Sequence, residues 1–139
     1  MRTVEDETGR RYLLRKRSAE SSLVFDPETG DERYVSNARL SDVGGESPLE
    51  TAARTVSDQV RTLLSAVHDD DGLGLLLELD RRGPLPVHEL MATYDLCESD
   101  LHGRIAELRV AGLIEEVNVN GERGYATTET AGTALSSLR

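Results

Sequence analysis

Few side chains in this sequence are suited to covalent or metal chemistry. The sequence has one cysteine, Cys97, and three histidines, His68, His88 and His102. A tetrahedral zinc site takes four ligands, often from paired cysteines, so a single cysteine disfavours such a site. A cysteine–histidine nucleophile is conceivable, but Cys97 falls in an expected turn between two helices, where a small buried apolar side chain is normal. We therefore expect no catalytic residue, no metal site and no cofactor, and a protein that is not an enzyme.

Recognition of an anionic or polar ligand is the chemistry that polar residues between positions 99 and 123 can perform. An expected helix carries five candidate contact residues: Ser99, His102, Gly103, Arg104 and Arg109. An arginine can bind guanine or a phosphate through two parallel hydrogen bonds, and a glycine lets the helix backbone approach its ligand closely. Asn120 and Arg123 lie at an expected hairpin tip, where they suit a phosphate or minor-groove contact. The alternative for each residue is an ordinary solvated surface side chain.

A second cluster of cations lies near the N-terminus. Residues 10–17 hold five positive charges and no acid. Strand alternation would place Arg11, Arg15 and Arg17 on one face and Lys16 on the other. Two roles stay open for Arg15, Lys16 and Arg17: they follow a phosphate backbone, or this region docks on the acidic remainder of the chain. Residues 1–40 hold eight basic and eight acidic residues, whereas residues 41–139 hold eight basic and eighteen acidic residues.

The elements that would position these residues follow one another from residue 69 to the end of the chain. Four helices are expected, over residues 72–82, 87–94, 99–111 and 130–138. Between the third and the fourth helix, residues 113–119 and 125–128 are expected to pair as a β-hairpin. Asp69–Asp71 are caps for the first helix, and Ser99 is the expected cap of the third. Asn120-Gly121 between the two strands is a strong hairpin signal. The first helix is apolar nearly all round, which marks a core helix.

Three segments of this region carry a family resemblance. Pro86–Met91 (PVHELM) resembles the opening helix of ArsR- and MarR-like regulators. Ser99–Ile114 resembles their recognition helix running into the first wing strand, with an L-x-x-x-G-L-I ending, and Gly124–Gly132 resembles their return strand. The resemblance covers about residues 71–139 and implies a winged helix-turn-helix domain that binds DNA through residues 99–109. Winged helices also dock proteins, so an adaptor that does not bind DNA is the alternative.

The first 70 residues form two further regions. Residues 1–40 contain three strand-like runs, Arg11–Arg15, Ser22–Phe25 and Glu32–Val35, which predict a three- or four-stranded antiparallel meander. Residues 41–70 are a linker and one helix, which starts with a capping box at Ser47 and Pro48. Its apolar positions follow a heptad pattern: Leu49, Ala53, Val56, Val60, Leu63 and Val67. This face either packs on the chain's own core or forms a dimer seam.

The composition is strongly acidic. The chain has 26 acidic and 16 basic residues, a net charge of −10, and Lys16 is its one lysine. With no tryptophan and one phenylalanine, this pattern resembles proteins of salt-accumulating halophiles such as haloarchaea. An acidic chain ordinarily argues against nucleic-acid binding, but salt screening weakens that argument. On the expected recognition helix, Asp100 and Glu107 offset Arg104 and Arg109.

These observations predict an α+β protein in which an N-terminal antiparallel β meander (1–40) precedes a linker and capped helix (41–70) and a winged helix-turn-helix domain (71–139). We expect a DNA-binding transcription regulator that takes double-stranded DNA and a second copy of itself as partners, or a protein partner if it is an adaptor. No apolar run approaches the roughly 18 residues of a membrane helix, and the N-terminus lacks an apolar signal region. We therefore expect a cytoplasmic location.

Overall fold

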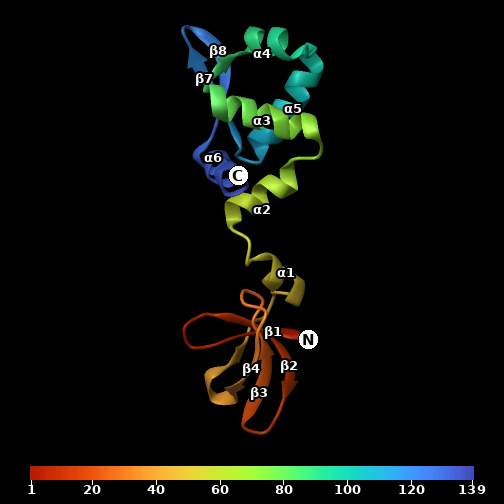
Figure 1. The fold of residues 1–139 in the computed structure, drawn as a ribbon, viewed down its shortest axis with the longest axis vertical. Coiled ribbons are helices and arrows are strands. Elements are labelled where there is room, and N and C mark those ends of the chain that lie inside the picture. Colours follow the sequence, from red (N-terminus) through yellow and green to blue (C-terminus); the bar gives the residue numbers. More distant parts are fainter. The chain divides into compact units, whose positions relative to one another are not determined.

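The computed structural model describes all 139 residues, which form two compact units, Met1–Ser57 and Asp58–Arg139. The first unit is a sheet with a short helix, and the second is mainly helical with a β-hairpin (Figure 1). The predicted α+β class is confirmed, because an antiparallel β meander precedes a winged helix-turn-helix domain. None of the helices combines the length and the apolar character needed to span a membrane.

The first unit is built on a five-stranded antiparallel sheet with the spatial order β4-β3-β2-β1-β5. Its elements are β1 (Arg2–Glu5), β2 (Arg11–Arg17), β3 (Ser21–Phe25), β4 (Glu32–Ser36), the 3-10 helix η1 (Asn37–Arg39), β5 (Ser41–Asp42) and helix α1 (Pro48–Ala53). The two predicted turns contain Gly9 and Gly30 with φ of 86° and 79°, a conformation that glycine adopts without strain. The sequence did not predict β1 and β5, because strands of four and two residues are defined by their pairing rather than by a local pattern.

A small apolar core lies on one face of this sheet. Its buried side chains are Val4, Tyr12, Leu14, Val24 and Val35. The Tyr12 hydroxyl donates a hydrogen bond to Asp6 over 3.2 Å and accepts one from Arg33. The polar end of the buried ring is therefore satisfied.

Helix α1 packs on the opposite face, against β1 and β2. Thr3 of β1 and Thr51 of α1 are both buried, and their hydroxyl oxygens lie 2.6 Å apart. The predicted capping box is confirmed: Ser47 accepts from the backbone of Glu50, and the Glu50 side chain accepts from the backbone of Ser47. The helix is thus fixed at its start and along its buried side.

Strand β2 contains a β-bulge that simple alternation does not predict. The register shifts between Leu14 and Lys16, so Arg15 is the extra residue. The shift places Arg17 on the face that carries Leu14, and it places Lys16 on the opposite face with Arg15. The prediction that Arg11, Arg15 and Arg17 share a face with Lys16 opposite is therefore wrong, because Lys16 and Arg17 have exchanged faces.

The prediction of a single long helix after residue 47 is also wrong. Helix α1 ends at Ala53, and a second helix, α2 (Asp58–Ala66), begins the second unit. The predicted heptad positions are divided between the units: Leu49 is 82% exposed on α1, whereas Leu63 of α2 is 2% exposed. Leu63 packs on the chain's own core, and the predicted heptad positions lie on two helices rather than one.

The second unit has the element order of a winged helix. It consists of α2, α3 (Asp70–Arg82), β6 (Leu85–Pro86), α4 (Val87–Tyr94), α5 (Glu98–Val110), β7 (Ile114–Val119), β8 (Glu122–Thr127) and α6 (Glu129–Ser137). The three strands have the spatial order β6-β8-β7. Every helix contributes to one core, which includes Leu63, Leu76, Leu90, Leu101 and Leu135.

The local sequence signals in this unit predicted the cap of α3 and the hairpin turn correctly, but they predicted the wrong first residue for α5. Asp69 caps α3, as predicted, and Asn120 and Gly121 turn the hairpin with φ of 53° and 87°. The cap of α5 is Cys97 rather than Ser99, because α4 ends in a single left-handed residue and the next helix starts early. Cys97 is exposed rather than buried, and its Sγ lies 3.4 Å from the Ser99 hydroxyl.

Asp6 makes the first unit sensitive to acid. Its carboxylate accepts hydrogen bonds from the Thr8 hydroxyl and from the backbone N–H groups of Thr8 and Arg10, and these lower its pKa from 3.8 to about 2. Because the pKa is lower in the folded state, Asp6 contributes its full stability above pH 4 and loses it as the pH falls towards 2. The loss should be on the order of 2 kcal/mol.

The measurement is the free energy of unfolding by denaturant at pH 5 and at pH 2.5, for the wild type and for Asp6→Asn. Other carboxylates respond to acid in both proteins, so the difference between the two isolates Asp6. We expect the wild type to lose more stability than the variant across this interval. An equal loss would contradict the assignment.

Candidate nucleic-acid interface

Helix α5 separates a buried face from an exposed one. Leu101, Ile105 and Leu108 are buried, as predicted. At 100° per residue, the opposite ridge consists of small or uncharged side chains. This ridge, called the α5 crest below, comprises Ser99, Gly103, Ala106 and Val110, and all four residues are exposed.

The α5 crest is low, because its central residue has no side chain. A Cβ atom placed on Gly103 would have no neighbour within 4 Å, so the glycine is not required by packing inside this chain. Gly in a helix interior destabilises it by roughly 1 kcal/mol relative to alanine. Gly103 thus weakens the helix and leaves room for an external group to reach the backbone.

The two flanks of the α5 crest carry opposite charges. His102 and Arg109 lie on one flank, and Asp100 and Glu107 lie on the other, according to the same helical spacing. His102 Nε2 lies 3.6 Å from the carboxylate of Glu98, an ion pair when the imidazole is protonated. Arg109 is exposed and makes no ion pair. Arg109 is therefore the cation of α5 that is free to bind an outside group.

Arg104 points towards α3 and is held there. Its Nη1 donates to Asp69 over 2.7 Å, and its Nη2 lies 3.7 Å from Asp71. The hydrogen bond from Arg104 lowers the pKa of Asp69, and the same bond raises the pKa of Arg104. Asp69 also accepts from the backbone N–H of Gly72. One carboxylate thus caps α3 and ties α5 to it.

The hairpin β7–β8 forms the wing. Asn118 accepts a hydrogen bond from the backbone of Gly121, which shapes the tip and leaves Asn120 exposed there. Arg123 is exposed, with its Nε 3.6 Å from Glu116. His88 of α4 lies 3.2 Å from Glu122 of β8, which links the wing to α4 when the imidazole is protonated.

Seven of the predicted site residues lie in the second unit, and three lie in the first. Ser99, His102, Gly103, Arg104 and Arg109 share α5, and Asn120 and Arg123 share the wing of the same unit. Arg15, Lys16 and Arg17 belong to the first unit. The prediction missed Ala106 on the α5 crest and the role of Asp69. Helical spacing from Gly103 would have found Ala106, whereas Asp69 is 35 residues from Arg104 and no local pattern links them.

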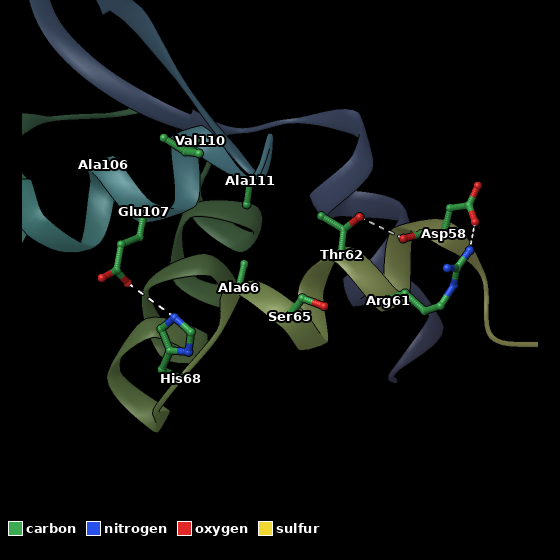
Figure 2. Close-up of a pocket in the computed structure, with 10 residues that line it drawn as sticks. All are labelled: Asp58, Arg61, Thr62, Ser65, Ala66, His68, Ala106, Glu107, Val110 and Ala111. Carbon is green, nitrogen blue, oxygen red and sulfur yellow. Dashed lines mark hydrogen bonds and ion pairs between the residues drawn. The ribbon is translucent and has the colours of Figure 1, made fainter. Parts of the chain in front are cut away.

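An open groove of about 840 Å³ borders the C-terminal part of the α5 crest (Figure 2). Its wall on one side is α2, and on the other side are Ala106, Val110 and Ala111. The charged groups at its rim face each other: His68 Nε2 lies 3.8 Å from Glu107, and Arg61 pairs with Asp58. The remaining lining residues are mostly small and apolar, with two hydroxyl groups among them: Thr62, Ser65, Ala66, Ala106, Val110 and Ala111.

The helix pair α4–α5 and the β7–β8 hairpin define the second unit as a winged helix. In the winged helices that bind DNA, the second helix of the pair and the wing are the elements that usually contact it. Residues 1–139 match the family DUF7346, which is described as a family of unknown function, and the chain belongs to this family.

Solved structures similar to this chain include the crystal structure of an ArsR family transcriptional regulator. The two share 23% sequence identity with a TM-score of 0.44, over 60% of this chain and 84% of the other. None of the curated proteins matches the chain.

Proposed function

We propose that this protein is a non-enzymatic transcription regulator that binds double-stranded DNA through its winged helix. The observation that carries the proposal is the α5 crest: an exposed ridge of small residues on the recognition helix, with Gly103 at its centre serving no packing role. The major groove of DNA is wide enough to admit a helix. A low ridge allows the helix backbone to reach the base edges.

The residues of the crest have matching chemistry for base edges. The Ser99 hydroxyl can donate or accept, and the Ala106 methyl suits contact with a thymine methyl group. Beside the crest, Arg109 can bind guanine or a phosphate. Asn120 and Arg123 at the wing suit a phosphate or the neighbouring minor groove. Arg104, already bound to Asp69, has a positioning role: it holds α5 at a fixed angle on α3.

The charge of the second unit sets the conditions for binding. Residues 58–139 contain seven basic and fifteen acidic residues, a net charge of −8. DNA phosphates repel this charge at low salt. The Debye length, the distance over which such repulsion acts, is about 10 Å at 0.1 M salt and about 3 Å at 1 M, so high salt weakens the repulsion. We propose that the protein works at high salt in the cytoplasm of a halophilic, archaeal cell, where its carboxylates are screened and hydrated.

We further propose a homodimer, so that two recognition helices read two half-sites of a palindrome. Leu64 of α2 and Leu138 after α6 are 66% and 55% exposed. Helices α2 and α6 pack side by side in the second unit (Figure 1). Two copies that meet at these helices would cover both leucines.

An adaptor that docks a protein is the second candidate, and one observation favours it. The recognition helix carries Glu98, Asp100 and Glu107, and its central arginine is already engaged by Asp69. A protein partner with a basic surface would match these acids.

Arg109→Gln is expected to weaken DNA binding by roughly 1–3 kcal/mol if Arg109 reads a base. It should also make the salt dependence shallower, by about 0.9 in the slope of log K against log salt, if Arg109 contacts a phosphate. Arg81→Gln is the matched control, because Arg81 has the same charge, is exposed and lies on α3. The measurement is fluorescence anisotropy on duplex DNA at several salt concentrations. Equal effects of the two variants would indicate a general loss of charge and no contact by Arg109.

Genome-wide crosslinking and sequencing of bound DNA in the native cells tests the function. The regulator predicts discrete promoter peaks with a shared palindromic motif, and these peaks should weaken in the Arg109→Gln strain. Background signal from a well-expressed wild-type protein would reject the regulator and favour the adaptor.

A further inference from the structure

The first unit has a sheet face that the winged-helix function does not use. On this face, α1 covers the part made by β1 and β2, where Thr3 contacts Thr51. The part made by the end of β2 with β3 and β4 carries two cations, two aromatic rings and one leucine: Arg15, Lys16, Phe25, Tyr34 and Leu23. We call these five residues the β3–β4 platform.

The β-bulge gathers the cations of this platform. In a regular strand, Arg15 and Lys16 would point to opposite faces. Alternation from Leu13 already places Arg15 on this face, where its guanidinium lies 5.2 Å from the centroid of the Phe25 ring, and the bulge brings Lys16 to the same face, where it pairs with Leu23. Arg17 points to the opposite face. Bulges often re-aim a side chain towards a binding site.

The groups on the platform are available to a ligand. Tyr34 is 64% exposed and aligns across the sheet with Leu23 and Lys16. Lys16 is exposed and makes no ion pair, and Arg15 is paired with Glu32 over 2.7 Å with much of its side chain in solvent. The exposed aromatic ring and the free ammonium lie two strands apart, about 10 Å.

We propose that the β3–β4 platform binds single-stranded nucleic acid. A base would stack on Tyr34, and Lys16 would contact a phosphate of the same strand. Stacking on an exposed ring combined with cations is the general mode by which single strands are bound without sequence preference. A duplex does not offer a free base face to a flat sheet.

Charge and the size of the apolar surface favour this ligand over an acidic peptide. The free cation attracts either polyanion. The exposed apolar area is essentially one ring, however, because Phe25 lies under Arg15 and Leu23 is half-buried. One ring matches a base, whereas an amphipathic helix needs a groove for several anchors. None of the platform residues belongs to the second unit, which holds the winged helix.

The test measures binding of a fluorescent single-stranded oligonucleotide of mixed sequence to the full chain by anisotropy, over a range of salt concentrations. Tyr34→Ala should weaken binding by about tenfold, the usual loss for one stacked base, and Tyr34→Phe should retain most of it. Lys16→Gln should lower the salt slope by about 0.7, the value for one phosphate contact on a single strand. Arg17→Gln removes the same charge from the opposite face and should change neither quantity.

Duplex binding through α5 separates this site from the proposed function. Tyr34→Ala should leave duplex affinity unchanged, whereas variants on α5 should leave single-strand affinity unchanged. The proposal is overturned if the wild type does not bind the oligonucleotide at low salt. It is also overturned if Lys16→Gln and Arg17→Gln change the salt slope of oligonucleotide binding by the same amount. A third contradicting result is that the binding of polyglutamate depends on Tyr34 and the binding of the oligonucleotide does not.

Discussion

Gly103→Gln is expected to weaken binding to the cognate DNA duplex by on the order of 100-fold. The α5 crest reaches the bases because Gly103 has no side chain, and a glutamine there would lift the helix away from the groove floor. Losing the readout of two bases, at roughly 1–3 kcal/mol for each base, accounts for this magnitude. The fold should not suffer, since a side chain at this position meets no neighbour within 4 Å. Glutamine should even stabilise the helix, by about 0.5 kcal/mol.

The matched control is Gly74→Gln on α3. Gly74 is also a helical glycine whose added Cβ meets nothing within 4 Å, but it does not belong to α5 or the wing. We expect the control to bind DNA as the wild type does. Affinity is measured by anisotropy on the cognate duplex and stability by thermal unfolding. If Gly103→Gln binds DNA as tightly as the control does, the recognition helix does not enter the groove.

Gly124→Ala is expected to destabilise the second unit strongly, because it forces a side chain between two paired strands. Gly124 lies on β8, where it pairs with Pro86 of β6. A Cβ atom there would lie 2.5 Å from the carbonyl oxygen of Leu85 and 2.8 Å from Val119 Cγ2. The nearer group is backbone and cannot rotate away, so β6 and β8 must separate. We expect a loss of roughly 3 kcal/mol, at the upper end for overpacking.

Gly132→Ala serves as the comparison for this effect. Its added Cβ would lie 3.6 Å from Asp80, an ordinary contact, and it replaces a glycine inside α6. The free energy of unfolding should rise by about 0.5–1 kcal/mol. Denaturant unfolding measures both variants. A Gly124→Ala protein as stable as the wild type would mean that β6 does not lie against β8 in solution.

The course of the second unit could be predicted because its signals are local. Asp69 as a cap and Asn120-Gly121 in the wing each act within a few residues. The buried side of α5 followed from helical periodicity. The prediction that Ser99 caps α5 was wrong. Serine is a favourable cap residue, but the length of the turn after Asp95 decides where α5 starts.

The features that were missed depend on contacts between distant residues. The bond between Arg104 and Asp69 was missed, because the two residues are 35 positions apart and no local pattern near Arg104 indicates it. The bulge at Arg15 depends on pairing between β2 and β3, which exchanges the faces of Lys16 and Arg17. A heptad count likewise cannot show that the helix after Ser47 is interrupted at residues 54–57.

Selection from a random library of duplex DNA tests the central claim most directly. The full-length protein would be incubated with the library at low and at high salt, and bound duplexes would be sequenced after several rounds. We predict enrichment of one motif, strongest where salt screens the acidic second unit, with no enrichment for Gly103→Gln and the same motif for Gly74→Gln. A wild-type pool that stays random at every salt concentration would contradict the claim that α5 reads DNA.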